Sequence, residues 1–191
     1  MSQSGPTNPT SAPPKGGLIL PHRNHLPRLG KDVYIAPTAT VIGDVEIGDQ
    51  ANIWFSVVIR GDDHEIRIGA RTNIQDGTIV HITGGVAGDA YPTHIGADVT
   101  IGHAAVIHGC TLEDRCLISM SATILDGAVV EEGAMVAAGA LVAPGKRVKA
   151  GELWAGVPAR RVRDITDEER IYMIEVPGHY VELGAEYLAA S

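Results

Sequence analysis

Aliphatic residues recur along this chain at every sixth position. One run of them extends from Ile35 to Ile59, and another, after a single five-residue step, extends from Leu112 to Trp154. A small or branched residue follows most of them four positions later, and glycine often follows directly. A sandwich of short strands would instead alternate apolar and polar residues with a period of two. A period of six is typical of a parallel β-helix, in which each hexad forms one short strand and one sharp corner.

The expected β-helix has a simple physical basis. Each hexad turns one aliphatic side chain inward, three hexads close one triangular coil, and successive coils stack at the strand spacing of about 4.8 Å. A single hexad cannot bury its own apolar side chain, so its stability depends on the neighbouring coils. We therefore predict an all-β fold, a parallel β-helix of hexapeptide repeats with about seven coils between residues 35 and 160.

The flanking segments divide the chain into three parts. Residues 1–17 are rich in Pro, Ser, Thr and Gly, and we expect a disordered N-terminal tail there. Residues 18–164 form the expected β-helix domain, and residues 165–191 form a C-terminal helical segment packed alongside it. The tail lacks the apolar stretch of a secretory signal, which favours a cytoplasmic location. No apolar run approaches the roughly 18–20 residues that are needed to cross a bilayer.

The C-terminal segment carries a helix signature. Thr166 and Glu169 have the spacing of a capping box, which starts a helix. We expect Pro177 and Gly178 to interrupt that helix, and residues 179–190 to form a second helical piece. Three isoleucines are expected to form the buried stripe: Ile165, Ile171 and Ile174.

Composition narrows the classes of function. The chain has 191 residues, 23 acidic against 15 basic side chains, and a formal net charge of −8. An acidic balance of this kind disfavours nucleic acid and anionic membranes as partners. The 2 cysteines cannot form a disulfide scaffold. The 23 glycines fit a fold with many tight corners, and the 8 histidines are a generous supply of metal ligands.

Two loops interrupt the six-residue period. The step from Ile59 to Ile68 is nine residues, and the step from Val80 to Ile95 is fifteen. If each loop counts as one enlarged corner, three steps make one coil, and positions one coil apart can be aligned. Three residues then share a column, each directly after an inward aliphatic residue: Arg60, His81 and His108.

His103 occupies a different edge of the predicted coil. It is the third residue of its hexad, and Asp76 lies one coil beneath it, with Gln75 one coil beneath Gly102. Imidazoles on two edges do not easily meet within one chain, but in a threefold trimer one edge faces a different edge of the neighbour. Three histidines around one open position are typical of a catalytic zinc site. The spacing therefore predicts a metal site between subunits.

These residues resemble the gamma-class carbonic anhydrase family, and within it the shorter bacterial branch of carbonic-anhydrase-like proteins. The resemblance covers about residues 20–190. It rests on an ordered set of motifs rather than on the hexads, because acyltransferases and nucleotidyltransferases share the hexads. The motifs are Ile59-Arg60-Gly61-Asp62, Thr72-Asn73-Ile74-Gln75-Asp76, His81, Ile101-Gly102-His103 and His108-Gly109-Cys110.

The resemblance implies a left-handed β-helix and a homotrimer with one metal at each subunit interface. His81 and His108 would come from one chain, and His103 would come from its neighbour. Zn²⁺ is the expected metal, with Fe²⁺ or Co²⁺ as alternatives, because imidazole accepts all three.

The family's other site residues carry over to matching positions. Arg60 and Asp62 correspond to an ion pair at the subunit interface. Gln75 would orient the metal-bound hydroxide toward CO₂, and Asp76 would support the site from behind the ligands. Asn73 would stand at a corner and tie adjacent coils together.

The implied activity is that of a lyase, the reversible hydration of CO₂ to bicarbonate through a metal-bound hydroxide. The proton-shuttling glutamate of the family's prototype is missing, because the loop at 82–94 contains Asp89 but no Glu. His64, Glu65 and His94 are substitutes by their proximity in sequence. Two alternatives stay open. One is an acyl-CoA-dependent hexapeptide acyltransferase, which needs a general-base histidine but no metal triad. The other is a catalytically weak metal-binding protein of the carbonic anhydrase type.

Overall fold

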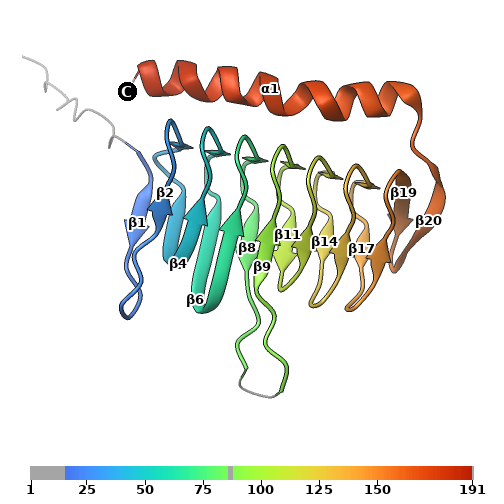
Figure 1. Cartoon of the computed structure of the whole chain (residues 1–191), viewed down its shortest axis with the longest axis horizontal. Coiled ribbons are helices and arrows are strands. Elements are labelled where there is room, and N and C mark those ends of the chain that lie inside the picture. Colours follow the sequence, from blue (N-terminus) through green and yellow to red (C-terminus); the bar gives the residue numbers. More distant parts are fainter. Residues whose placement is uncertain (1–15, 86–87, 191) are drawn as a thin grey trace, which may run out of the picture.

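The computed structural model describes residues 16–85 and 88–190, and within them the strands form one twelve-stranded and one eight-stranded sheet, followed by a helix (Figure 1). The tail expected over residues 1–17 lies, up to residue 15, outside the described residues. The sheets wind into a parallel β-solenoid, so the prediction of an all-β, left-handed parallel β-helix with a helix alongside is confirmed.

The eight-stranded sheet forms one face of the solenoid, which we call the first face. Its parallel partners lie one coil apart, since Tyr34 pairs with Asn52 and Leu117 with Met135, 18 residues on in each case. Counted over the described residues, seven parallel strands stack on this face, which agrees with the predicted number of coils. The strands are β3 (Tyr34–Ile35), β5 (Asn52–Ile53), β7 (Asn73–Ile74), β10 (Thr100–Ile101), β13 (Leu117–Ile118), β16 (Met135–Val136) and β19 (Glu152–Gly156), closed by the antiparallel β20 (Ala159–Asp164).

The twelve-stranded sheet folds around a corner and forms the other two faces. The long strands β4 (Thr40–Ile47) and β6 (Val58–Ile68) pass around that corner, so β8 pairs with the beginning of β6 and β9 pairs with its end. The second face also contains β1 (Leu18–Leu20), β8 (Ile79–His81), β11 (Val106–His108), β14 (Thr123–Ile124) and β17 (Leu141–Val142). The third face also contains β2 (Arg28–Leu29), β9 (Thr93–Ile95), β12 (Thr111–Leu112), β15 (Val129–Val130) and β18 (Arg147–Val148).

Both interruptions lie at enlarged corners, as predicted, but the expected loop between Ile59 and Ile68 is wrong, because these residues belong to the continuous strand β6. Ile79 pairs with Val106 across 27 residues, because the loop between β8 and β9 lengthens the coil without changing the order of its strands. In Figure 1 this loop projects from the solenoid on the side opposite the helix. The register of the later coils is therefore independent of what the loops contain.

Columns of aliphatic side chains fill the interior. Ile53, Ile74 and Ile101 are fully buried one above another on the inner side of the first face. Each corner needs a residue in the left-handed region, where glycine has no steric cost. In the last coils glycine takes this conformation at six-residue intervals from Gly127 to Gly151. The glycines of the last coils therefore follow from the repeated corners, whereas residues such as Gln50 and Ser56 take the left-handed conformation in the earlier coils.

The helix α1 (Asp167–Ala189) runs back along the first face toward the N-terminal coils and contacts β3, β5, β7 and β10 (Figure 1). Its capping box of Thr166 and Glu169 is confirmed. The expected interruption at Pro177 and Gly178 is wrong, because the helix is continuous. Pro177 removes one backbone donor, but its buried ring packs against the solenoid, and this tertiary contact outweighs the local preference.

The buried stripe of α1 also differs from the expectation. Ile165 is buried, whereas Ile171 and Ile174 are 55% and 63% exposed. The indole of Trp54 on the solenoid packs edge-on against two tyrosines of α1, which fixes the rotation of the helix about its axis. Three residues of α1 are buried as a result: Met173, Pro177 and Gly184.

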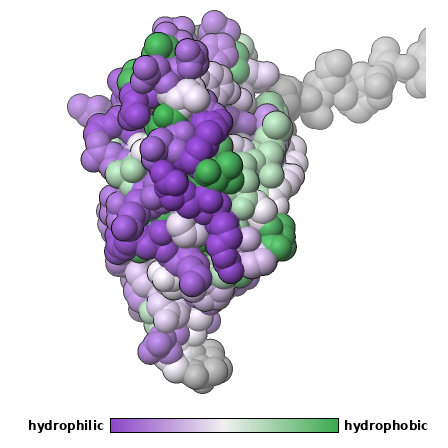
Figure 2. All heavy atoms as spheres, turned by 90° about the vertical axis from the view of Figure 1, so that its right-hand side faces the viewer, coloured by the Kyte–Doolittle hydropathy of each residue, from purple (hydrophilic) through white to green (hydrophobic). Residues whose placement is uncertain are grey.

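The end of the solenoid that carries its last coil is mainly hydrophilic, with hydrophobic residues scattered between polar ones (Figure 2). In the part of the chain that the structure describes, no helix is both long and apolar enough to cross a membrane.

Candidate metal centre

The second face carries His81 and His108 directly above one another. The strand register pairs Arg60 with His81, and His81 with His108. Side chains alternate along a strand, so the residue after each inward aliphatic residue points outward. The hexad count therefore placed this column correctly.

The two imidazole rings face each other. His81 Nδ1 lies 3.2 Å from His108 Nε2, and the ring centroids are 5.1 Å apart. The other nitrogen of each ring meets a carboxylate, since His81 Nε2 is 3.2 Å from Asp62 Oδ1 and His108 Nδ1 is 2.6 Å from Asp126 Oδ1. A carboxylate keeps the ring N–H on its own side, which leaves the lone pairs on the two nitrogens that face each other. That arrangement suits a cation between the rings.

The surroundings of His81 favour its neutral form, chiefly through burial. Burial lowers the pKa of His81, and Arg60 and His108 act in the same direction, while Asp62 opposes them. Burial alone would raise the pKa of Asp62, but hydrogen bonds from Arg60 and His81 hold it below its usual range. Only a neutral imidazole binds a metal. We call Arg60, Asp62, His81, His108 and Asp126 the first half-site.

Two members of the first half-site have positions that were not expected. Asp62 forms an ion pair with Arg60 within one chain and also contacts His81. Asp126 was missed altogether, although the stacking of Ile107 on Ile124 places it one coil above Gly109, beside His108. Counting along the hexads gives only this stacking position, and the contact of Asp126 with the His108 ring depends on the orientation of the side chain.

His103 stands at the corner between the first and second faces. Its Nδ1 lies 2.8 Å from Asp76 Oδ2, and the two side chains are 46% and 45% exposed. Asp76 is one coil beneath His103, as predicted, and its Oδ1 accepts a hydrogen bond from the backbone N–H of Phe55 at 3.2 Å. Nε2 of His103 makes no hydrogen bond to any residue that the structure describes.

Asn73 of β7 and Gln75, which directly follows β7, point outward on the first face. Gln75 is buried, and its Nε2 donates to Asn73 Oδ1 at 3.0 Å. Asn73 in turn donates to Thr100 Oγ1 of the next coil at 2.8 Å, so it ties adjacent coils as expected. It does not stand at a corner, because Arg71, with φ of +59°, makes the corner before β7. We call Asn73, Gln75, Asp76 and His103 the second half-site.

The two half-sites are separate within one chain. Over residues 16–85 and 88–190, no hydrogen bond or ion pair joins them, and no group of three or more His, Cys, Asp or Glu side chains could hold a metal. Two ligands bound at about 2.0–2.1 Å to a tetrahedral zinc lie about 3.3 Å apart. The 3.2 Å between His81 and His108 is close to that separation. The spacing in the first half-site thus fits two histidine ligands of one metal ion, and the third ligand has to come from outside this half-site.

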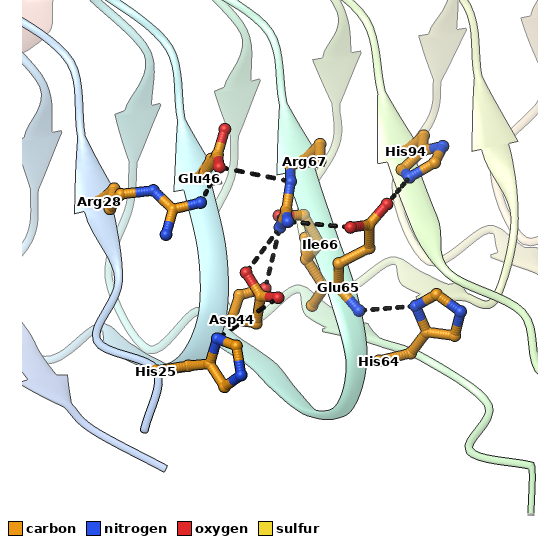
Figure 3. Close-up of polar contacts among 9 residues, drawn as sticks. All are labelled: His25, Arg28, Asp44, Glu46, His64, Glu65, Ile66, Arg67 and His94. Atoms are coloured by element: carbon orange, nitrogen blue, oxygen red, sulfur yellow. Dashed lines mark hydrogen bonds and ion pairs between the residues drawn. The ribbon is translucent and has the colours of Figure 1, made fainter. Parts of the chain in front are cut away.

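A further polar cluster covers the third face beside the bulge of β6 (Figure 3). The guanidinium group of Arg67 has one nitrogen 2.9 Å from Asp44 Oδ1 and another 2.9 Å from Glu65 Oε2. Its Nε lies 3.6 Å from Glu46 Oε1. Glu65 also meets His94 at 3.0 Å. Because every carboxylate here has a cationic partner, the cluster binds the N-terminal strands to the coil above them.

The candidate substitutes for a proton shuttle gather in this cluster. The backbone N–H of Glu65 donates to His64 Nδ1 at 2.8 Å, and the side chain of Glu65 contacts His94. His64, Glu65 and Asp62 all line one cleft of about 350 Å³. The cleft thus brings His64 and Glu65, but not His94, next to a member of the first half-site.

Comparison with known proteins adds a family context to this geometry. Residues 27–61 match the family described as bacterial transferase hexapeptide (six repeats). The probable carbonic anhydrase of Methanocaldococcus jannaschii is 53% identical over 155 residues, which cover 81% of this chain and 94% of that protein. Gamma carbonic anhydrase 2, mitochondrial, of Arabidopsis thaliana is 51% identical over 158 residues, or 82% of this chain, and the chain spans only 57% of its length. A solved structure of a putative acetyltransferase from Bacillus cereus is 37% identical, with a TM-score of 0.87 and coverage of 93% of this chain and 100% of that one.

Proposed function

The chain belongs to the gamma carbonic anhydrase family of hexapeptide-repeat proteins, and from that premise we propose that it is a lyase that catalyses the metal-dependent, reversible hydration of CO₂ to bicarbonate. The observation that carries the proposal is the facing pair of His81 and His108. Each ring has one nitrogen on a carboxylate and turns the other toward the shared space between them.

The metal would lie between two copies of the chain in a homotrimer. His81 and His108 of one copy and His103 of another would hold Zn²⁺, or alternatively Fe²⁺ or Co²⁺. His103 fits this role because it is exposed on a different edge, with Nδ1 on Asp76 and Nε2 turned to no described residue of its own chain. A threefold arrangement repeats such a heterologous contact three times and then closes. A zinc ion held by three imidazoles supplies a Lewis acid that lowers the pKa of water to about 7.

Gln75 would orient the attacking water toward CO₂. Its Nε2 is engaged by Asn73, which leaves Oε1 as the atom that can accept a hydrogen bond from that water. Asn73 is itself held by Thr100, so the side-chain amide of Gln75 is positioned by a chain of hydrogen bonds rather than by solvent. Reaction in a fixed geometry lowers the entropic part of the barrier.

Arg60 and Asp62 would hold His81 in place. The ion pair keeps Asp62 ionised, and the ionised carboxylate accepts the N–H of His81 Nε2. Asp76 would do the same for His103. Each ligand ring would thus present one defined nitrogen to the metal.

Metal analysis combined with stopped-flow CO₂ hydration tests the proposal. We expect about one metal per chain, and hydration that is lost with a chelator and restored by Zn²⁺. A protein that binds this metal but does not hydrate CO₂ would instead be a catalytically weak metal-binding member of the family. A protein that binds no divalent metal would overturn the site.

A second candidate is favoured by the similarity to a putative acetyltransferase. An acyl-CoA-dependent transferase needs a general-base histidine next to its acceptor. It does not need two imidazoles facing each other with a carboxylate behind each. Binding of acetyl-CoA in calorimetry, together with transfer of the acetyl group to an acceptor, would favour this activity over CO₂ hydration.

A further inference from the structure

We propose that Asp126 is a positioning residue for His108, and that it fixes the ring so that Nε2 is presented toward His81 and toward a metal held there. The inference rests on the proposed function for the presence of the metal. The contact between Asp126 and His108, however, lies within one chain and can be tested without activity.

The contact is the shortest of its kind in the two half-sites. Asp126 Oδ1 lies 2.6 Å from His108 Nδ1, compared with 3.2 Å for Asp62 and His81, and 2.8 Å for Asp76 and His103. Short hydrogen bonds to an ionised carboxylate are the strong ones. With the proton of His108 held on Nδ1, the lone pair is on Nε2, the nitrogen that faces His81.

Asp126 has a narrower set of contacts than Asp62. The carboxylate of Asp62 is shared between Arg60 and His81. Among the described residues, the carboxylate of Asp126 makes its side-chain hydrogen bond to His108 alone. A substitution of Asp126 therefore acts on one ring and does not break an ion pair elsewhere.

The chain leaves space for this carboxylate. Gly109 has a φ of +54°, and a Cβ there would lie 2.6 Å from Asp126 Oδ1 and 2.9 Å from the Cβ of Tyr91. Any other residue at position 109 would push the carboxylate away from the ring. The loop after β8 covers the same place, since Thr83 pairs with Tyr91 and its Oγ1 lies 3.4 Å from His108 Nδ1.

The test compares Asp126→Ala and Asp126→Asn with Asp114→Ala. Asp114 is a matched control because it also stands at a corner above a glycine, Gly96, but it accepts the backbone N–H of Ala97 instead of an imidazole N–H. The dissociation constant for Zn²⁺ is measured by competition with a chromophoric chelator. We expect Asp126→Ala to weaken Zn²⁺ binding roughly 10- to 100-fold, as for other carboxylates behind a histidine ligand.

The two other variants set the scale of the effect. Asp126→Asn keeps an oxygen that can accept the Nδ1–H, so it should recover most of the lost affinity. Asp114→Ala removes the same charge elsewhere and should leave the affinity within about twofold of the wild type.

A second measurement reads the ring directly in the metal-free protein. Nitrogen chemical shifts of ¹⁵N-labelled histidine report which ring nitrogen is protonated, and the spectrum of His108→Gln identifies the signals of His108. We expect the Nδ1–H form in the wild type and a mixture of both forms in Asp126→Ala. Gly109→Ala should shift the same signals, because it displaces the carboxylate.

The possible failures are distinguishable. An unchanged affinity for Zn²⁺ and an unchanged protonated nitrogen in Asp126→Ala would overturn the role of Asp126 while leaving the proposed function intact. A wild type that does not bind Zn²⁺ would overturn the proposed function, and the histidine spectrum would still decide whether Asp126 sets the state of His108.

Discussion

The two half-sites differ in how much of their geometry a single chain supplies. The first half-site places two imidazoles on adjacent coils, partly buried, with a carboxylate behind each. The second half-site has one imidazole, 46% exposed, with one carboxylate. Residues in one column of a β-helix are brought together by the strand spacing alone. His103 lies in another column, where its described neighbour is Asp76 and not a second imidazole, so under the proposed function it would bind metal only together with a second copy of the chain.

The largest expected effect is the loss of metal and of CO₂ hydration when one of the three histidines is removed. His81→Ala, His108→Ala and His103→Ala should each lose the metal and lower CO₂ hydration more than about 10³-fold, because water then keeps its high pKa. Each variant should remain trimeric in sedimentation.

Mixing two of these variants tests whether the half-sites combine between subunits. When His81→Ala and His103→Ala chains are mixed and reassembled, some interfaces regain all three histidines, so metal and activity should return in part.

The matched control for this experiment mixes His81→Ala with His108→Ala. Both substitutions lie in the same half-site, so no interface regains the full set, and the mixture should stay inactive. Recovery in this control, or stoichiometric metal in His103→Ala alone, would show that the half-sites are not combined as proposed.

A smaller effect is expected for Gln75→Ala in the second half-site. Loss of the amide should lower kcat roughly 10- to 100-fold through poorer orientation of the water, while the metal content stays unchanged. The variant also leaves the buried Asn73 Oδ1 without its donor, which should cost about 1–3 kcal/mol in the free energy of unfolding. Stopped-flow kinetics and urea unfolding measure the two quantities. A fall in metal content would instead assign Gln75 to metal binding.

Asp76→Ala should weaken Zn²⁺ binding by less than about tenfold, which is below the range expected for Asp126→Ala. Asp76 and His103 are about half exposed, so water can replace the carboxylate at Nδ1. Chelator competition on both variants makes the comparison. An equal or larger loss in Asp76→Ala would mean that subunit contact buries the second half-site more deeply than one chain does.

The smallest effect concerns α1, which covers the first face and thus the strands of the second half-site. Hydrogen bonds from Arg163 and from the backbone N–H of Thr166 lower the pKa of Glu169 from 4.5 to about 2. Because the folded-state pKa is the lower one, the stabilisation is complete above pH 4.5 and is lost as the pH falls toward 2.

Thermal unfolding followed by circular dichroism can test this dependence. Wild type should be more stable than Glu169→Gln at pH 6, and the difference should vanish between pH 4.5 and about 2. A difference that persists at pH 2 would show that the charge of Glu169 is not responsible.

Counting along the hexads was sufficient to align Arg60, His81 and His108, and to place Asp76 beneath His103. It succeeded because each coil has three strands regardless of loop length, so the loops do not shift the register. It did not show that Asp126 lies beside His108. That contact depends on the rotation of a side chain around a corner, and on Gly109 leaving the space open.

For α1, the sequence predicted where the helix begins but not how it packs on the solenoid. Its start at Thr166 was predictable, because a capping box is a local arrangement of four residues. The continuity of the helix through Pro177 and the exposed position of Ile171 were not predictable from the sequence. Both depend on how α1 packs against Trp54 and its neighbours on the solenoid.

The sequence by itself determined the coil, its column of histidines and the separation of the third histidine onto another edge, because a strict period of six translates directly into position around a three-sided coil. Only the tertiary structure decided which ring nitrogen of each histidine contacts a carboxylate, which carboxylate that is, and which face of α1 is buried. Those features depend on side-chain rotation and packing between residues that are distant in sequence, and no periodicity encodes them.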